Sequence, residues 1–302
     1  ENMGSHVYAK YLFDNKIDVI GMINYEMIGY FTNENVDLSK LSMFITKKDA
    51  DISKELTKVY KKAGMKILAN SSVEKIEMSD EGCSVIVKNR KDESVQTITC
   101  DIVLSAAGVT PNTEDIGLEV LGIETDRGMI KVDAYYRTNV PGIYAIGDVI
   151  PTQALAHVAS AEGITCVEKI AGHHPEPIDY SNIPGCTYCW PEVSSVGMTE
   201  AQAKEAGYEL KIGKFPFSAS GKASASGAKD GFVKMIFDAK YGEFLGGHMI
   251  GANVTEMIAE LVLAKKLEST GHEILKAIHP HPTMSEAVME ATAAAYDEVI
   301  HL

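Results

Sequence analysis

The chain has 302 residues and a formal net charge of −14 at pH 7. Hydrophobic residues make up 45% of it and charged residues 23%, as in an ordinary globular protein. The acidic balance disfavours nucleic-acid binding, and no apolar run reaches the ~18 residues of a transmembrane helix. No signal peptide is visible, and the five scattered cysteines are not the disulfide framework of a secreted protein. The sequence therefore predicts a cytoplasmic protein without membrane partners.

The first 45 residues show neither a helical nor a strand period, but the pattern becomes regular from Asp49 onward. Acidic residues suited to a helix N-terminus open a helix there, and Gly64 ends it. The apolar stripe that this helix buries consists of Ile52, Leu56, Val59 and Tyr60. Residues 65–70 then predict a strand.

Three short β-type runs follow, at residues 73–78, 83–89 and 95–100, separated by polar turns. This spacing predicts an antiparallel meander. Residues 101–108 predict a buried strand that ends in a glycine turn.

The stretch TNVPGIYAIGDV, residues 138–149, predicts a strand from Ile143 to Ile146 that ends at Gly147. Asp148 would then lie at the carboxyl end of that strand, where ligands bind in open α/β sheets. The next helix, expected from near Ala154, would point its positive N-terminus at the same place. Such a site can hold sugar hydroxyls and a polarised carbonyl, although Asp148 could instead only cap the helix.

A proline-rich segment at residues 175–184 predicts a domain boundary. Beyond it, a helix with Gly207 near its end precedes three strands, at residues 209–217, 231–239 and 243–251. This part of the chain therefore alternates helices and strands.

Two helices complete the chain. Residues 253–267 predict a helix that Asn253 caps, with Glu256 completing a capping box. Its buried face consists of Met257, Ile258, Leu261 and Val262. The last helix is expected from near Thr283, where Thr283 and Glu286 again have the spacing of a capping box.

Two histidines, His279 and His281, each precede a proline just before this last helix. A neutral imidazole can take up a thiol proton and return it near neutral pH, and Pro280 and Pro282 would stiffen its backbone. Two structural interpretations stay open from the residues alone. His281 could be a hydrogen-bonded interface histidine, and Glu286 could be only a helix cap.

These motifs together resemble the flavoprotein pyridine nucleotide-disulfide reductase family over about residues 49–302. TNVPGIYAIGDV resembles the second FAD-binding motif, and ALAHVASAEG resembles the helix start beneath the flavin. IPGCTYCWPEVSSVGMTEAQA and LGGHMIGANVTEMIAE resemble the interface domain. The pattern HxHPTxSE within HPHPTMSEAVMEA is most like the dihydrolipoamide dehydrogenases of that family.

The resemblance implies an α/β fold of partial NAD- and FAD-binding Rossmann-like domains followed by a C-terminal dimerisation domain. Residues 1–106 would be the remainder of the NAD-binding domain with the meander, residues 1–45 being poorly matched. Residues 107–178 would belong to the FAD-binding domain and residues 179–302 to an α+β interface domain. The implied contacts to FAD and NAD are at Val73, Gly108, Gly147, Asp148, Ala154, Leu155, Ala156 and His157.

The resemblance also implies an activity. His281 would be the general acid/base, Glu286 would orient its ring, and His279 would pack in support. The site would be shared across a homodimer that oxidises dihydrolipoamide through a disulfide and FAD to NAD. Its partners would be lipoyl domains of 2-oxoacid dehydrogenase complexes or the glycine-cleavage carrier protein. A glutathione-type sibling reductase and a non-catalytic dimerisation module are the alternatives.

Parts of the family pattern are missing from the sequence. Neither GxGxxG loop nor the redox pair CxxxxC occurs, so we expect this chain to be part of a longer reductase. Cys186 and Cys189 form a CxxC, but at the start of a predicted strand, whereas a redox thiol is activated at a helix N-terminus. No further ligands are spaced for zinc. These two residues are therefore expected to be structural cysteines.

Overall fold

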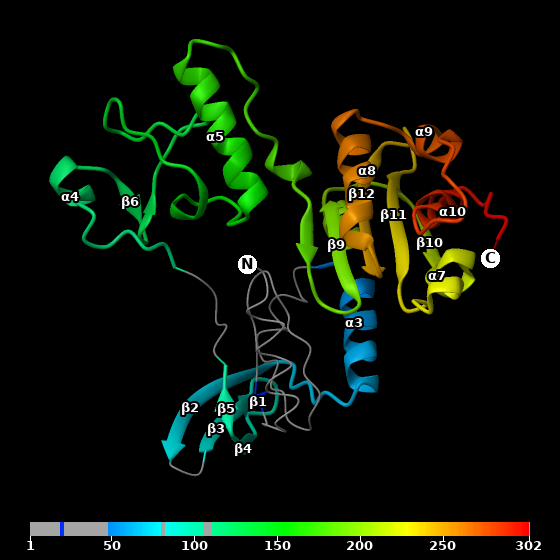
Figure 1. The fold of residues 1–302 in the computed structure, drawn as a ribbon, viewed down its shortest axis with the longest axis horizontal. Helices are drawn as coiled ribbons and strands as arrows, with labels where there is room; N and C mark the ends of the chain where they lie inside the picture. The colour runs from blue at the N-terminus through cyan, green and yellow to red at the C-terminus, as the bar shows by residue number, and fades with distance from the viewer. Residues whose placement is uncertain (1–18, 21–47, 80–81, 105–109, 302) are drawn as a thin grey trace. The chain divides into compact units, whose positions relative to one another are not determined.

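The computed structural model describes residues 19–20, 48–79, 82–104 and 110–301 (Figure 1). The expectations for Gly108, and most of those for the first 45 residues, lie outside the described residues. Within the part that is described, no helix is both long enough and apolar enough to cross a bilayer.

The chain divides into two compact units. One comprises Glu1–Gly108 together with Pro184–Leu302, and the other comprises Val109–Ile183. The first unit holds the meander and the C-terminal sheet, and the second holds the glycine–aspartate turn.

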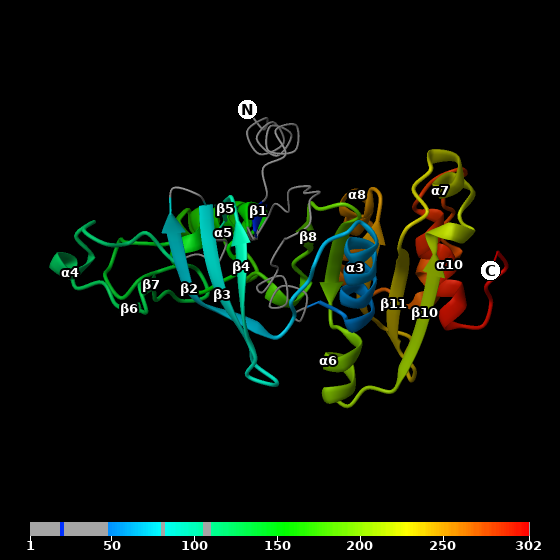
Figure 2. The same cartoon turned by 90° about the horizontal axis from the view of Figure 1, so that it is seen from below.

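The predicted meander is confirmed. Strands β2 (Ser71–Ser79), β3 (Gly82–Asn89) and β4 (Val95–Cys100) form an antiparallel sheet in that order (Figure 2). Val85 and Val87 of the central strand are buried, and the residues that alternate with them, Ser84, Ile86 and Lys88, are half-buried. This is the period of two that the sequence carries.

One strand prediction beside the meander is wrong. Residues 65–70 form no strand, because the chain turns at Asn70, whose φ of 58° leads directly into β2. Of the strand predicted over residues 101–108, the described part holds β5 (Ile102–Val103), which pairs in parallel with β1 (Val19–Ile20), and residues 105–108 lie outside the described residues. With so short a ladder, β5 is half-buried rather than buried.

The C-terminal part is built on a five-stranded antiparallel sheet of order β10-β11-β12-β9-β8. The strands are β8 (Gly185–Thr187), β9 (Glu192–Gly197), β10 (Leu210–Pro216), β11 (Phe232–Asp238) and β12 (Phe244–Gly251). The three predicted strands are thus confirmed. β11 and β12 are buried along their whole length, because both faces of the sheet are covered.

The helices of this part are α6 (Glu200–Glu205), α7 (Gly221–Ser226), α8 (Val254–Lys266), α9 (Gly271–Lys276) and α10 (Glu286–Ala295), with a 3₁₀ turn η3 (Phe217–Ala219). α8 and α10 pack on the face of the sheet that presents Val233, Met235 and Phe237. Met257, Ile258 and Leu261 of α8 are buried there as predicted, and Val262 is partly buried.

The capping box predicted at the start of α8 is wrong. Asn253 does precede the helix, but its φ of 61° is left-handed and its side chain caps no N–H. The carboxylate of Glu192 on β9 does this instead, because its Oε2 accepts both the N–H and the hydroxyl of Thr255, at 3.2 and 2.8 Å. A residue distant in sequence has replaced the local cap.

The opposite face of the sheet holds α3 (Ala50–Lys62), the first predicted helix, which is confirmed. Asp49 is its N-cap and accepts the N–H of Asp51. Its stripe is buried against residues of the sheet and its flanks. This cluster consists of Ile52, Leu56 and Tyr60 with Cys189, Val193, Phe232 and Ile250.

A buried lysine ties the start of α3 to the sheet. Lys234 of β11 has a side chain only 2% exposed, and its ammonium lies 2.9 Å from Asp49 Oδ1, 2.9 Å from Asp51 Oδ2 and 2.7 Å from Glu200 Oε2. Burial lowers the pKa of Lys234, but the three carboxylates outweigh it and raise that pKa above its usual value. Each of its three N–H donors therefore has an ionic partner.

The second unit carries mostly short elements around one long helix. They are α4 (Leu118–Leu121), β6 (Thr125–Asp126), β7 (Met129–Ile130), η1 (Gly147–Val149), α5 (Ala156–Ile170) and η2 (Tyr180–Asn182). Its core includes Tyr136, Ile150 and Cys166.

The strand predicted from Ile143 to Ile146 is wrong. Ile146 is extended, with φ −139° and ψ 165°, but among the described residues the segment has one isolated bridge, from Tyr144 to Arg137. An extended segment becomes a strand only through a partner ladder. The helix after it begins at Ala156, two residues later than expected.

Candidate functional site

The two residues proposed for proton transfer are in contact. His281 Nδ1 lies 2.8 Å from Glu286 Oε1 at the start of α10. The side chain of His281 is 77% exposed, and within the described residues its Nε2 has no hydrogen-bond partner. The ring is thus held by one nitrogen and presents the other outward.

Glu286 contacts both the ring of His281 and the backbone that precedes α10. Its Oε1 holds His281, and its Oε2 accepts the N–H of Thr283 at 2.8 Å. The capping box is only half formed, because the hydroxyl of Thr283 donates to the Pro280 carbonyl at 2.7 Å instead. For the same reason α10 begins at Glu286 and not near Thr283, and no side chain caps it.

The charge on Glu286 selects the tautomer of His281. Burial works against the charged carboxyl, but the Thr283 N–H and the His281 ring outweigh it and hold the pKa of Glu286 below its usual value. A carboxylate requires a donor, so the neutral ring of His281 carries its hydrogen on Nδ1. Its Nε2 then has a free lone pair that can accept a proton.

His279 lies in a different environment from His281. Its side chain is only 5% exposed. Nδ1 lies 3.0 Å from the Ala277 carbonyl oxygen, and Nε2 lies 2.8 Å from Glu260 Oε1 on α8. Sequence reasoning did not select Glu260, because that helix has two glutamates, Glu256 and Glu260, and no local pattern distinguishes them.

A second group of predicted residues lies in the other compact unit. Gly147 has a left-handed φ of 72°, and a Cβ there would lie 3.2 Å from Ala159 Cβ, so this tight approach of η1 to α5 favours glycine. Asp148 is exposed, and no side chain caps the N-terminus of α5. Ala154 and Leu155 are half-buried and Ala156 and His157 exposed.

This arrangement fits a flavin. An exposed carboxylate beside a helix N-terminus without a side-chain cap can accept hydroxyl hydrogen bonds and stabilise an electron-rich carbonyl. Val73 is 42% exposed on β2 of the first unit, and Gly108 lies outside the described residues. The structure therefore groups Gly147 and Asp148 with the start of α5.

Sequence reasoning missed one buried carboxylate in this unit. Glu162 of α5 is fully buried, and its Oε2 accepts the N–H of Gly147 at 2.7 Å. Its Oε1 accepts the hydroxyls of Thr152 at 2.7 Å and Tyr180 at 2.8 Å. Its place in the stripe between Val158 and Cys166 was the signal, since that position faces the core.

Replacing Glu162 with leucine is expected to lower the free energy of unfolding by about 3 kcal/mol, because buried donors without acceptors are destabilising by ~1–3 kcal/mol each. Chemical denaturation of the whole protein measures this. Glu168→Leu changes an exposed glutamate of the same helix and should leave stability within ~0.5 kcal/mol. Equal stability of the two variants would contradict a clamping role for Glu162.

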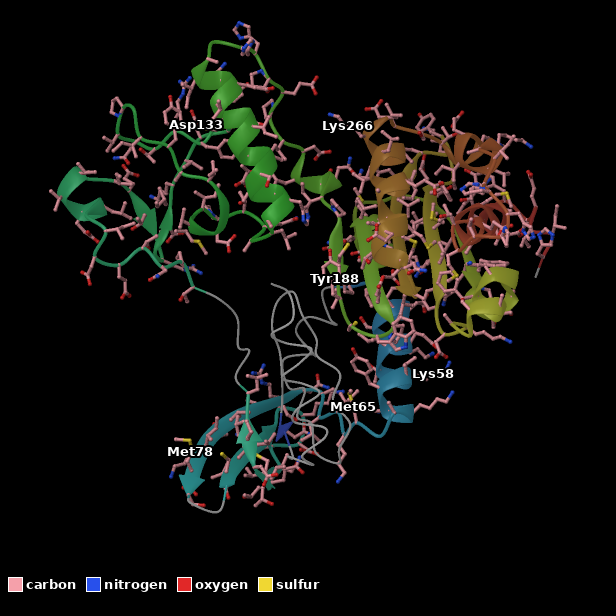
Figure 3. The ribbon with its side chains drawn as sticks, in the orientation of Figure 1. Lys58, Met65, Met78, Asp133, Tyr188 and Lys266 are labelled. Atoms are coloured by element: carbon pink, nitrogen blue, oxygen red, sulfur yellow. The ribbon has the colours of Figure 1, made fainter. Side chains whose placement is uncertain are left out.

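The cysteines do not form a redox centre in the described residues. None of the five forms a disulfide in the structure. Burial raises the pKa of the Cys186 thiol, and it raises that of Cys189 to about 11, whereas a reactive thiol needs a lowered value. Tyr188 between them, which is labelled in Figure 3, is 59% exposed. The described residues also hold no group of three or more His, Cys, Asp or Glu side chains suited to a metal ion.

Fold and site together define a mixed α/β protein whose C-terminal domain carries a histidine–carboxylate pair able to move a proton. Residues 11–163 match the family model described as pyridine nucleotide-disulphide oxidoreductase. Residues 183–292 match the dimerisation domain of the same group. The chain belongs to the pyridine nucleotide-disulphide oxidoreductase family, which confirms the resemblance found in the sequence.

Two dihydrolipoyl dehydrogenases are similar in sequence to this chain over most of its length. A dihydrolipoyl dehydrogenase of Rhizobium etli is 46% identical over 93% of this chain and 59% of its own length. That of Zymomonas mobilis is 44% identical over 93% of this chain and 61% of its own length. The crystal structure of LpdA from Mycobacterium tuberculosis superposes with a TM-score of 0.75 at 22% identity, covering 91% of this chain and 60% of that one. The chain thus spans about 60% of the length of these relatives.

Proposed function

We propose that the chain is part of a dihydrolipoamide dehydrogenase. The observation that carries this is the His281–Glu286 pair at 2.8 Å, with Nε2 of His281 exposed. The 46% identity to the Rhizobium etli dihydrolipoyl dehydrogenase supports the substrate. The domain division at residues 106/107 and 178/179 is part of this proposal.

In this function His281 moves protons of the substrate dithiol. Its Nε2 takes the proton of one thiol, and the resulting thiolate attacks an active-site disulfide, forming a mixed disulfide and releasing the other sulfur as a thiolate. The second substrate thiol then resolves the mixed disulfide, so dihydrolipoamide loses two electrons and two protons in all. Glu286 keeps the ring in the required tautomer and stabilises the imidazolium.

The cofactors proposed are FAD and NAD. FAD would take the two electrons from the reduced redox pair and would supply hydride transfer to NAD. Gly147, Asp148 and the residues Ala154 to His157 would hold the flavin, and Val73 and Gly108 would lie near a dinucleotide. Glu162 would keep the Gly147–Asp148 turn in place for this.

The partners proposed are a second copy of the chain and a lipoyl carrier. The match to the dimerisation domain supports a homodimer. None of the five thiols is suited to be the redox pair, so that disulfide would lie in the remaining part of the full-length protein, and His281 of one subunit would act on the disulfide of the other. Lipoyl domains of 2-oxoacid dehydrogenase complexes or the glycine-cleavage carrier protein would bring the dithiol, in the cytoplasm.

The test is the visible spectrum and the turnover of the full-length natural protein. Bound flavin, and NADH formation from NAD with dihydrolipoamide as reductant, are expected. Flavin with reduction of glutathione disulfide in place of dihydrolipoamide oxidation would support the sibling reductase. A protein that binds no flavin would leave only the dimerisation module.

A further inference from the structure

His279 is fixed on both sides of its ring. Its two nitrogens lie 3.0 Å from the Ala277 carbonyl oxygen and 2.8 Å from the Glu260 carboxylate, and its side chain is nearly inaccessible to water. A carbonyl oxygen and a carboxylate only accept hydrogen bonds. Both ring nitrogens must therefore carry hydrogen, and His279 is an imidazolium in this geometry.

The surroundings of His279 support that charge. Two charged groups face it, Glu260 on α8 and Glu286 at the start of α10. The hydrogen bond to Glu260 raises the pKa of His279, and burial opposes it with a smaller effect. The positive charge is therefore kept at pH values where an ordinary histidine is neutral.

The segment that carries His281 is anchored at both ends. His279 holds its beginning to α8 through Glu260, and the Thr283 hydroxyl and N–H hold its end through Pro280 and Glu286. His281 lies between these anchors, and its only hydrogen bond among the described residues is to Glu286. Release of the first anchor would let the exposed ring leave Glu286.

We propose that His279 is a positioning residue. As an imidazolium bound to the Ala277 carbonyl and the Glu260 carboxylate, it keeps His281 hydrogen-bonded to Glu286. This rests on the proposed function for its effect on turnover, but not for its effect on the His281 ring. The sign of the pH dependence follows from the raised pKa. The imidazolium with both of its hydrogen bonds is present at and below the ordinary pKa of histidine. It is lost as pH rises through the raised pKa, because one ring nitrogen then becomes an acceptor that faces another acceptor.

The experiment compares Glu260→Leu with Glu260→Gln in the full-length, flavin-loaded protein. Leucine removes the partner of His279, whereas the glutamine amide can accept from Nε2 or, turned over, donate to it. Glu256→Leu, an exposed glutamate one turn earlier on α8, is the matched control. Glu260→Leu is expected to lower turnover of dihydrolipoamide about tenfold, since small misplacements of a reacting group have such effects. Glu260→Gln and Glu256→Leu should stay within about twofold of the natural protein.

A second readout does not depend on activity. Nitrogen NMR of the histidine rings should show His279 doubly protonated at neutral pH, and a His281 Nδ1–H held by Glu286 that is lost in Glu260→Leu. A His279 that is neutral at pH 7, or a His281 Nδ1–H unchanged in Glu260→Leu, would overturn the proposal. If the natural protein did not oxidise dihydrolipoamide, the proposed function would fail while the NMR result still decided the role of His279.

Discussion

Replacing His281 with glutamine is expected to lower dihydrolipoamide oxidation by the full-length protein about 10²- to 10⁴-fold, the usual contribution of a general acid/base. Glutamine keeps the size of the side chain but cannot take up the thiol proton. Flavin content should not change, because His281 lies in the first compact unit and the proposed flavin residues lie in the second. Steady-state rates with dihydrolipoamide and NAD measure the loss.

Two controls show whether the loss belongs to the thiol step. His174→Gln, a change to an exposed histidine of the second unit, should leave the rate unaltered. Electron transfer from NADH to an artificial acceptor bypasses the dithiol, so His281→Gln should leave that rate unaltered as well. An equal loss in both assays would place the defect in the flavin or in folding, contrary to a proton-transfer role.

Glu286→Gln is expected to lower dihydrolipoamide oxidation less than His281→Gln, because His281 keeps a hydrogen-bond partner but loses the charge that favours the Nδ1–H tautomer. The pKa of Glu286 is lowered. The effect of its charge on the His281 ring is therefore present above the ordinary carboxyl pKa and is lost as pH falls through the lowered pKa. The difference in rate between Glu286→Gln and the natural protein should therefore narrow in acid. A pH profile of both rates checks this, and a Glu286→Gln rate equal to that of the natural protein at neutral pH would exclude the orienting role.

Replacing Lys234 with methionine is expected to lower the free energy of unfolding by about 3–5 kcal/mol. Methionine fills a similar volume, but the Asp49 carboxylate, 1% exposed, would lose the ammonium on which it depends. Removing one partner of a buried ion pair leaves an uncompensated charge, and measured losses are of this size. Chemical denaturation gives the value, and the N-terminus of α3 should show the earliest loss of amide protection.

The matched control for Lys234 is Lys204→Met, which removes an exposed lysine bonded to Glu200 at 2.5 Å. Exposed pairs contribute ~0–1 kcal/mol, so the change should be small. Asp49→Asn added to Lys234→Met should restore part of the loss, because the buried charge is then gone. A double variant no more stable than Lys234→Met would mean that packing, and not charge, explains the effect.

The Lys234 cluster also sets a pH range for stability. Burial opposes the charge of Asp49, but Lys234 outweighs it, and the pKa values of Asp49, Asp51 and Glu200 are all lowered. The contribution of these carboxylates to stability is present above the ordinary carboxyl pKa values and is lost as pH falls through the lowered pKa values. The contribution of Lys234 to stability is present below the ordinary lysine pKa and is lost as pH rises through its raised pKa. The cluster is therefore complete around neutral pH.

The local sequence pattern was sufficient to predict an element wherever that element buries one face and exposes the other. The stripe of α3, the alternation of the meander and the buried face of α8 all follow from a period of 3.6 or 2 in consecutive residues. The same reasoning failed for residues 65–70 and 143–146, because a short apolar run becomes a strand only when another segment supplies its hydrogen bonds. It failed at Asn253 because Glu192, some 60 residues earlier, satisfies the helix N-terminus.

By itself the sequence determined the residue types of the site and their order: a glycine–aspartate turn before a helix, and HPHPTMSE at the start of the last one. The family follows from those motifs. The tertiary structure decided the partners: Glu162 on Gly147, Glu260 on His279, and Lys234 among three carboxylates. The physical reason is distance along the chain. A charge state or a tautomer depends on which acceptor lies within hydrogen-bond reach, and folding brings those acceptors from segments that the sequence keeps apart.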